Sequence, residues 1–337
     1  MEWDSVENVT ITGGGVIDGN GPAWWYDPGP SNNRMDMVEP WNINGLVIED
    51  ITLRRSPAWT VHPVNCSNVL VRNIFLESVV QYDDVEYDGH NVDGVDPENC
   101  VNVTIENSVI RAGDDCIAIY STLDAPAPAT QNVTVRNVTC YTPLTITHGR
   151  DTHDVLFENC TVIGNWGHSA DPLWRPQWFH TAFRLKTGEN KGPTGGTIHD
   201  ITYRNIRVEE VHLAIDFQQY YPCQNTSGTA NYNYCTQLEP QTTLDRTVEL
   251  PSWYNIRFEN ISGTAWRAGW MNCAPTSPCR NVSLSNFELK PLQFPAHEFD
   301  AVAGYVCDHV NGTTGPGPVD PPLEGCFNDG VQFGSLL

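Results

Sequence analysis

Residues 101–113 read VNVTIENSVIRAG, in which apolar and polar residues alternate until an asparagine interrupts the pattern and a second short strand follows. Eight other segments share this form: an Asn or Asp, alternating apolar residues, a turn residue and another apolar stretch. Alternation with a period of two, broken by Asn or Gly, predicts two short β-strands joined by a bend. The nine segments are residues 7–19, 44–56, 67–78, 101–113, 131–141, 153–164, 199–211, 254–265 and 280–290.

The spacing of these segments predicts how they assemble. Neighbouring segments begin as little as 22 to 26 residues apart, and longer spacings exceed this by lengths typical of inserted loops. Such a repeat marks a solenoid, in which each coil buries its apolar face only by stacking on the next coil. Helical patterns are absent, which disfavours α/β architectures. We therefore predict an all-β chain folded as a right-handed parallel β-helix with nine recognisable coils.

The repeat runs through most of the chain, so one β-helix domain is expected over residues 1–337. Breaks in the repeat predict loop insertions near residues 79–90, 164–182 and 221–252. The last part, residues 291–337, is expected to be a tail stapled by disulfide bonds.

Eleven cysteines are many for a chain of 337 residues, and several lie close together in loops rich in Pro, Gly and Asn. Such pairs are suited to disulfide bonds. Cys66 and Cys100 occupy equivalent positions on neighbouring coils, where they either pair or pack against each other. The expected disulfides are Cys273–Cys279, Cys307–Cys326 and Cys223–Cys235.

The net charge of −23 argues against nucleic acid and anionic membrane surfaces as partners, because both require clustered Lys and Arg. No apolar run is long enough to span a membrane. The start, MEWDSVENVT, lacks the basic and apolar regions of a signal peptide, so the mature protein is expected to begin here. Together with the cysteines, these features predict a secreted, extracellular protein, which we expect to be a monomer.

The segment from residue 91 to residue 121 contains six acidic residues, of which four are aspartates. Asp93 and Asp114 are 21 residues apart, close to one coil, and strands of neighbouring coils lie about 4.8 Å apart. We therefore expect these carboxylates to lie one above the other, with Asp115 beside them. Asp96, which precedes Pro97, is expected to accept hydrogen bonds from backbone N–H groups of a turn. Like charges this close are costly, so one carboxyl should hold a proton.

A protonated carboxyl beside ionised carboxylates has the groups needed for hydrolysis of a glycosidic bond. The acid protonates the leaving oxygen and the other carboxylates activate a water, at a separation of about 6.5–9.5 Å in an inverting enzyme. The Cys and His residues lack the spacing of zinc ligands, so no metal site is expected.

Basic and aromatic residues farther along suggest how a sugar would bind. Arg184 and Lys186 are two apart on a predicted strand and so share a face, in a chain with only three lysines. They would bind an acidic sugar and keep the carboxylates ionised, or else form a salt-bridged surface. Trp174 and Trp178 lie in the insertion before that strand, either as stacking platforms for sugar rings or as apolar anchors of the loop. Tyr220 is expected to border the same cleft.

Three short motifs in order resemble those of glycoside hydrolase family 28, the polygalacturonases and their relatives. Residues 91–93 (NVD), 113–116 (GDDC) and 184–186 (RLK) are similar to the family's N-T-D, G-D-D-C and R-I-K motifs. The segments SPAWTVHPVNCSNVLVRNI and GGGVIDGNGPAWW also look like that family, and the similarity covers nearly the whole chain. The resemblance implies a pectin-lyase-like right-handed β-helix and an inverting hydrolase that needs no metal or other cofactor.

The resemblance also implies roles for individual residues. It makes Asp114 the general acid, Asp93 and Asp115 the groups that activate water, Arg184 and Lys186 the ligands of a substrate carboxylate, and Asn91 the residue that orients the cluster.

One motif of the family is missing. Thr142 and Pro143 stand where the His-Gly of its Gly-His-Gly motif belongs, and His148 would replace that histidine only if its loop reaches back. This favours a divergent member. We expect hydrolysis of α-linked galacturonic acid in an acidic pectin-type polysaccharide, in an exo-acting form if the cleft is closed. A rhamnogalacturonan hydrolase, an α-L-rhamnosidase, a calcium-dependent lyase and a non-catalytic carbohydrate-binding β-helix remain alternatives.

Overall fold

The computed structural model describes most of the chain, and regular structure in this part is almost entirely β-strand. A short helix, α1 (Pro22–Trp25), is the exception. Within these residues no helix is both long and apolar enough to cross a membrane. The described residues are 2–25, 34–82, 85–89, 91–122, 126–147, 151–164, 181–186, 196–219, 250–292, 304–323 and 325–327.

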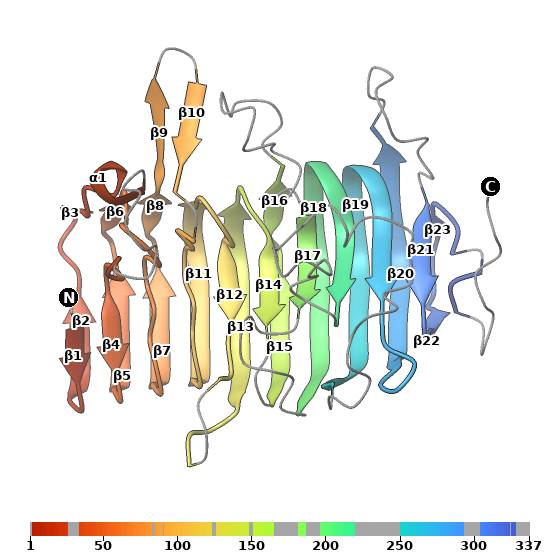
Figure 1. Cartoon of the computed structure of the whole chain (residues 1–337), viewed down its shortest axis with the longest axis horizontal. Helices are drawn as coiled ribbons and strands as arrows, with labels where there is room; N and C mark the ends of the chain where they lie inside the picture. Colours follow the sequence, from red (N-terminus) through yellow and green to blue (C-terminus); the bar gives the residue numbers. More distant parts are fainter. Residues whose placement is uncertain are drawn as a thin grey trace, which may run out of the picture.

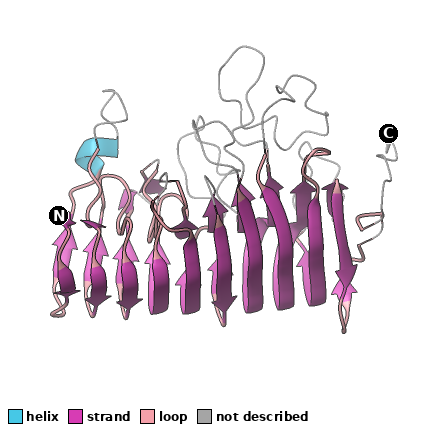
Figure 2. Ribbon diagram, turned by 90° about the horizontal axis from the view of Figure 1, so that it is seen from below, coloured by secondary structure: helices cyan, strands magenta, loops and turns pink. Residues whose placement is uncertain are grey.

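The strands pair in parallel from coil to coil along the long axis of the molecule, which makes a parallel β-helix (Figures 1 and 2). Each coil contributes to up to three ladders of backbone hydrogen bonds. The first ladder consists of β2 (Glu7–Ile11), β5 (Asn44–Glu49), β7 (Ser67–Arg72), β11 (Val101–Arg111), β13 (Thr130–Cys140), β15 (Thr152–Glu158), β18 (Thr197–Gln218), β19 (Ser252–Asn272), β20 (Cys279–Pro291) and β22 (Val310–Thr314).

The second ladder follows the bend in each coil, and the third ladder closes the coil. The second joins β3 (Val16–Asp18), β6 (Thr52–Arg54), β8 (Phe75–Glu77), β16 (Thr161–Ile163) and β23 (Val319–Asp320) to the later parts of the long strands. The third joins β12 (Ile117–Ile119), β14 (Leu144–Thr147), β17 (Thr181–Lys186), the ends of β18 and β19, and β21 (Tyr305–Asp308).

Two smaller sheets accompany this stack. β1 (Glu2–Asp4) pairs in parallel with β4 (Glu39–Trp41). β9 (Val79–Tyr82) and β10 (Val85–Asp88) form an antiparallel hairpin that projects from the stack in Figure 1.

Asparagines at the bends account for the sequence repeat. Asn102 and Asn107 have φ angles of 59° and 51°, in the left-handed region that Asn tolerates better than most residues. Their amides also bond from coil to coil: Asn102 Nδ2 donates to Asn68 Oδ1 at 3.1 Å, and Asn132 Nδ2 donates to Asn102 Oδ1 at 2.8 Å. The repeated Asn thus sets the bend and links neighbouring coils.

All nine predicted segments form rungs of the first ladder, and the described residues add a tenth rung that the sequence pattern missed. This rung is β22, which pairs in parallel with β20. His309 takes the left-handed bend conformation before it, with φ of 51°, and the strand itself reads VNGTT. The pattern failed here because neither the bend asparagine nor the apolar alternation is present.

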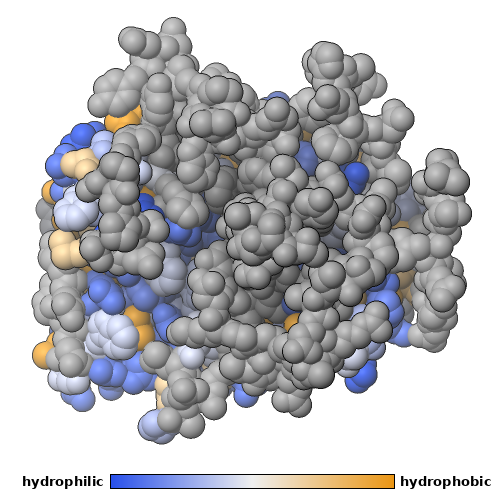
Figure 3. Space-filling model, in the orientation of Figure 1, coloured by the Kyte–Doolittle hydropathy of each residue, from blue (hydrophilic) through white to orange (hydrophobic). Residues whose placement is uncertain are grey.

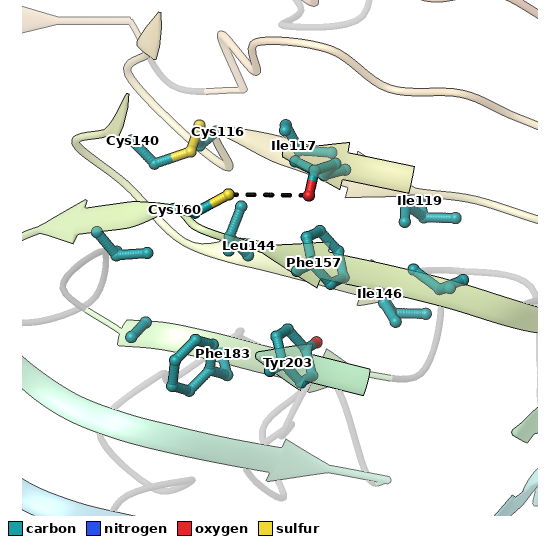
Figure 4. Packing of buried hydrophobic residues seen from close by; sticks show 14 of the residues in the cluster. Cys116, Ile117, Ile119, Cys140, Leu144, Ile146, Phe157, Cys160, Phe183 and Tyr203 are labelled. Carbon is teal, nitrogen blue, oxygen red and sulfur yellow. Dashed lines mark hydrogen bonds between the residues drawn. A yellow bond between two sulfur atoms is a disulfide. The ribbon is translucent and has the colours of Figure 1, made fainter. Parts of the chain in front are cut away.

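Apolar side chains from the three ladders fill the interior of the coils. Phe157, Tyr203 and Phe258 stack on successive coils with ring centroids 4.8 and 5.1 Å apart. Figure 4 shows Phe157 and Tyr203 in this column. Stacking of like residues follows from the parallel register, which places equivalent side chains one coil apart. Outside the core, most described residues visible in Figure 3 are hydrophilic.

Two of the predicted disulfides are present, together with one that was not predicted. The predicted Cys223–Cys235 pair lies outside the described residues. Cys66 and Cys100 are buried and unbonded, so they pack rather than pair. The bonds are Cys273–Cys279, Cys307–Cys326 and, between neighbouring coils, Cys116–Cys140 (Figure 4).

Candidate active site

The third ladder is buried on both of its sides. Strands of the first ladder, such as β7, alternate between buried and more exposed residues. In β12, β14 and β17 every residue is buried, including Arg184 and Lys186, which are each 6% exposed. Charged groups on the outer side of this ladder therefore interact in surroundings of low dielectric, where their effects on one another are strong.

The three predicted acidic residues come together beside this ladder. Rung pairing places Asp93 level with Asp115 on the next coil, and Asp114 is adjacent to Asp115. One carboxylate oxygen from each of the three lies within 4.8 Å of the others, and the three residues are 2%, 5% and 0% exposed for Asp93, Asp114 and Asp115. Asn91, in the left-handed region with φ of 51°, donates from Nδ2 to Asp114 Oδ2 at 3.3 Å. The expected cluster is therefore present, but the register stacks Asp93 on Asp115, 22 residues later, and not on Asp114.

Burial and mutual repulsion change the acidity of this cluster. Burial, followed by the charge of Asp115, raises the pKa of Asp114 to about 7. Burial, followed by the charge of Asp114, raises the pKa of Asp93 well above its usual value. The cluster therefore retains a proton near neutral pH, as the sequence predicted.

The two predicted cations contact the same cluster. Lys186 Nζ lies 3.0 Å from Asp115 Oδ2, and Arg184 Nη1 lies 3.7 Å from Asp115 Oδ1. Burial is the largest influence on the pKa of Lys186 and lowers it, but the carboxylates of Asp115, Asp114 and Asp93 outweigh burial and the net direction is upward. The charge of Asp115 is thus compensated inside the protein.

A further carboxylate in the site escaped the sequence reasoning. Asp216 pairs in register with Arg184, and Arg184 Nε donates to Asp216 Oδ2 at 3.3 Å. Gln218 Nε2 donates to both oxygens of Asp216 at 2.9 Å. Strand alternation in LAIDFQQ would place Asp216 and Gln218 on one face, but only the structure identifies the coil against which they lie.

Asp96 accepts a backbone hydrogen bond, but from the neighbouring coil rather than from its own turn. Its Oδ1 accepts a hydrogen bond from the backbone N–H of Ala118 at 3.1 Å.

His62 lies beside Asp96 in the ladder. It contacts Asp36 Oδ2 through Nδ1 at 2.8 Å and Glu98 Oε2 through Nε2 at 2.9 Å. Burial lowers the pKa of His62, but the two carboxylates outweigh it and raise the pKa to about 9.

The segment before β4 brings another cation near the cluster. Arg34 donates from Nη1 to the carbonyl oxygen of Pro57 at 3.1 Å. Burial lowers the pKa of Arg34, and the charges of Asp93 and Asp114 oppose this effect. Sequence reasoning missed Arg34 because it lies 59 residues before Asp93, outside every motif.

The nearest oxygens of the three carboxylates lie within 4.8 Å of one another. The separation between the carboxyl groups themselves, about 6.5–9.5 Å in an inverting enzyme, stays a prediction. Thr142, which takes the position of the missing histidine, lies level with Asp115, and its buried hydroxyl has no hydrogen-bond partner among the described residues. The predicted residues His148, Trp174, Trp178 and Tyr220 lie outside the described residues.

Three carboxylate oxygens this close could also bind a hard cation such as Ca²⁺. The ammonium group of Lys186 already lies 3.0 Å from Asp115. A divalent ion would therefore be repelled by a buried positive charge, which argues against a metal here.

Comparison with known proteins identifies relatives of this chain. The sequence profile of glycosyl hydrolases family 28 matches residues 1–293. Polygalacturonase-2 of Solanum lycopersicum is 25% identical over 86% of this chain and 56% of its own length. Exopolygalacturonase X-1 of Emericella nidulans is 26% identical over 90% of this chain and 66% of its own length. The chain thus spans roughly half to two thirds of the curated relatives that it matches.

Solved structures show the same fold. An exopolygalacturonase from Thermotoga maritima superposes with a TM-score of 0.68 at 18% identity, over 94% of this chain and 71% of that chain. A polygalacturonase from Erwinia carotovora superposes with a TM-score of 0.64 at 18% identity, over 93% and 72%. These likenesses confirm the predicted right-handed parallel β-helix. With the profile match over residues 1–293, they show that the chain belongs to glycosyl hydrolases family 28.

Proposed function

We propose that this protein hydrolyses α-linked galacturonic acid in pectin-type polysaccharide. The observation that carries the proposal is the set of three buried carboxylates within 4.8 Å, one with a pKa of about 7, beside two buried cations. Asp114, protonated near neutral pH, is the group suited to donate a proton to the leaving oxygen. Asp93 and Asp115 would then take a proton from the attacking water.

The substrate carboxylate would approach Arg184 and Lys186. Both cations already contact Asp115, so a uronate would share them with this carboxylate. This arrangement suits an acidic sugar better than a neutral one, because Arg184 and Lys186 can form charge-assisted hydrogen bonds with its carboxylate. The contact with Asn91 would hold Asp114 in position during proton transfer.

Inversion at the anomeric carbon and exo action are finer parts of the proposal. Inversion follows the family resemblance, whereas retention would require a covalent glycosyl-enzyme intermediate. Proton NMR of the first-formed anomer distinguishes the two outcomes. Exo action is suggested by relatives named exopolygalacturonases, and early products of one fixed size would support it.

The decisive experiment compares wild type with Asp114→Asn on polygalacturonate, rhamnogalacturonan and an aryl rhamnoside, with products resolved by length. Release of reducing sugar from polygalacturonate that is lost in the variant supports the proposal. Activity only on the other two substrates would point to a rhamnogalacturonan hydrolase or a rhamnosidase. Unchanged turnover in Asp114→Asn would refute the assignment of the acid, and binding without product would indicate a carbohydrate-binding protein.

A lyase on this fold would give an unsaturated product and depend on Ca²⁺. Hydrolysis predicts no new ultraviolet absorbance from a double bond and full activity in a chelator.

Three disulfide bonds in the described residues support the further proposal that the protein is secreted.

A further inference from the structure

Arg267 lies in line with the acidic cluster, although it is far away in sequence. The register of the third ladder places Asp93, Asp115 and Thr142 at one level on successive coils. Thr181, Leu213 and Arg267 occupy the same level on the next three coils. Arg267 is thus four rungs beyond Asp115, about 19 Å along the stack at about 4.8 Å per rung.

Two tryptophans hold the guanidinium of Arg267. Its Cζ lies 5.3 Å from the ring centre of Trp266 and 5.6 Å from that of Trp270. His212 stacks on Trp266 with ring centroids 4.3 Å apart, and Trp270 is only 7% exposed. Cation–π contacts through the ring faces fix the plane of the guanidinium and leave its in-plane N–H groups directed elsewhere.

This arginine has no acidic counterpart in the described part of the chain. No carboxylate there lies within ion-pair distance of Arg267, and its Nε is buried without a hydrogen-bond partner. Arg184 and Arg204, by contrast, each contact an Asp or Glu. A partly buried cation with no acidic partner among the described residues is costly, and it is conspicuous in a chain with 41 acidic and 18 basic residues. Its planar fork of donors matches the geometry of a carboxylate.

The outer side of the third ladder connects this arginine to the candidate active site. Arg184, Asp216 and Trp270 are paired on three successive rungs, so they share one face and follow the long axis. Figure 1 shows β17, β18 and β19 side by side in this order. A linear polysaccharide bound at the carboxylate cluster and extending along this axis would pass Trp270 and Arg267.

We propose that Arg267, held between Trp266 and Trp270, binds the carboxylate of a uronic acid residue several sugars from the scissile bond, on the C-terminal side of the site. The inference rests on the proposed function and adds a distal subsite to it. The guanidinium would form a bidentate contact with the carboxylate of the sugar. The subsite would favour long, unesterified chains.

The test measures kcat/KM on galacturonate oligomers of two to seven units for wild type, Arg267→Met and Arg267→Lys. Methionine keeps the stem of the side chain but removes the charge, whereas lysine keeps the charge without the planar fork. For six or seven units, Arg267→Met should lose about tenfold or more, because a charge-assisted hydrogen-bonded contact is removed. For two units, the kcat/KM of Arg267→Met should match that of wild type. For six or seven units, the kcat/KM of Arg267→Lys should fall between those of Arg267→Met and wild type. Arg257→Met is the matched control, since Arg257 is exposed on the same strand.

Binding gives a readout that is independent of turnover. In the Asp114→Asn background, titration calorimetry should show that Arg267→Met weakens binding of heptamer about tenfold or more without changing binding of dimer. An equal loss of activity at every length would mean that Arg267 only supports the packing of Trp266 and Trp270, and would overturn the inference. No loss at any length would overturn it too, with the proposed function intact. A wild type inactive on every galacturonan would overturn both.

Discussion

The pKa of Asp114 predicts that the residue proposed as the catalytic acid destabilises the fold above neutral pH. Its pKa rises from 3.8 to about 7, mainly through burial and then through the charge of Asp115. A group whose folded-state pKa is raised contributes stability that is fully present below the unfolded pKa and is lost as pH rises through the folded pKa. The window of loss therefore runs from about pH 4 to above pH 7. A shift of about 3 units at about 1.4 kcal/mol each corresponds to about 4 kcal/mol.

Asp114→Asn removes this penalty, because asparagine resembles the protonated carboxyl at every pH. At pH 4 the variant and wild type should have similar free energies of unfolding. At pH 8 the variant should be more stable by up to about 4 kcal/mol, while being inactive. Equilibrium urea unfolding, followed by tryptophan fluorescence at both pH values, measures the difference. Asp18→Asn is the control, since Asp18 forms an exposed ion pair with Arg55 and its loss should cost about 0–1 kcal/mol at pH 8. A stability difference that is the same at pH 4 and pH 8, or a variant weaker than wild type at pH 8, would refute the reasoning.

Three further predictions follow from the charges of the site. Because the acid must carry its proton, kcat/KM on polygalacturonate should fall about tenfold per pH unit above about pH 7, and a rate that stays level to pH 9 would contradict this. Lys186→Met should lower the free energy of unfolding by about 3–5 kcal/mol, because it leaves the charge of Asp115 poorly compensated. Adding Asp115→Asn to this variant should recover much of the loss. As a control, Lys290→Met should change the free energy of unfolding little, because Lys290 is exposed. His62, with its pKa raised to about 9, stabilises the fold fully below about pH 6.5, so the stability gap between wild type and His62→Gln should narrow by about 3 kcal/mol between pH 6 and pH 10 in urea unfolding.

Much of the fold could be predicted because the repeat is local. Alternation and bend asparagines lie within about a dozen residues and report directly on strand and turn conformation. β22 escaped prediction because it lacks both signals, although pairing with β20 still recruits it. The disulfide between Cys116 and Cys140 escaped for a different reason. Its two cysteines lie 24 residues apart, Cys116 just before β12 and Cys140 at the end of β13, and only their coil register brings them together.

The same distinction between local signals and coil register applies to the candidate site. Asp93, Asp114 and Asp115 were placed together from sequence because one uninterrupted coil separates them, and Arg184 with Lys186 because they share one strand. An inserted segment separates the acidic residues from the two cations in the sequence. Its length does not define where the chain returns to the stack, so the sequence could not establish that Arg184 and Lys186 contact Asp115.

The sequence by itself determined the coil repeat, the inward and outward faces of each strand, and the acidic cluster, because these depend on spacings within one coil. Only the tertiary structure decided that Asp216 contacts Arg184, that His62 lies between Asp36 and Glu98, and that Arg267 stands in line with the acids. These residues come together across inserted loops, and the free energies of their interactions depend on burial. Both register and burial are properties of the assembled stack, which no local pattern of residues encodes.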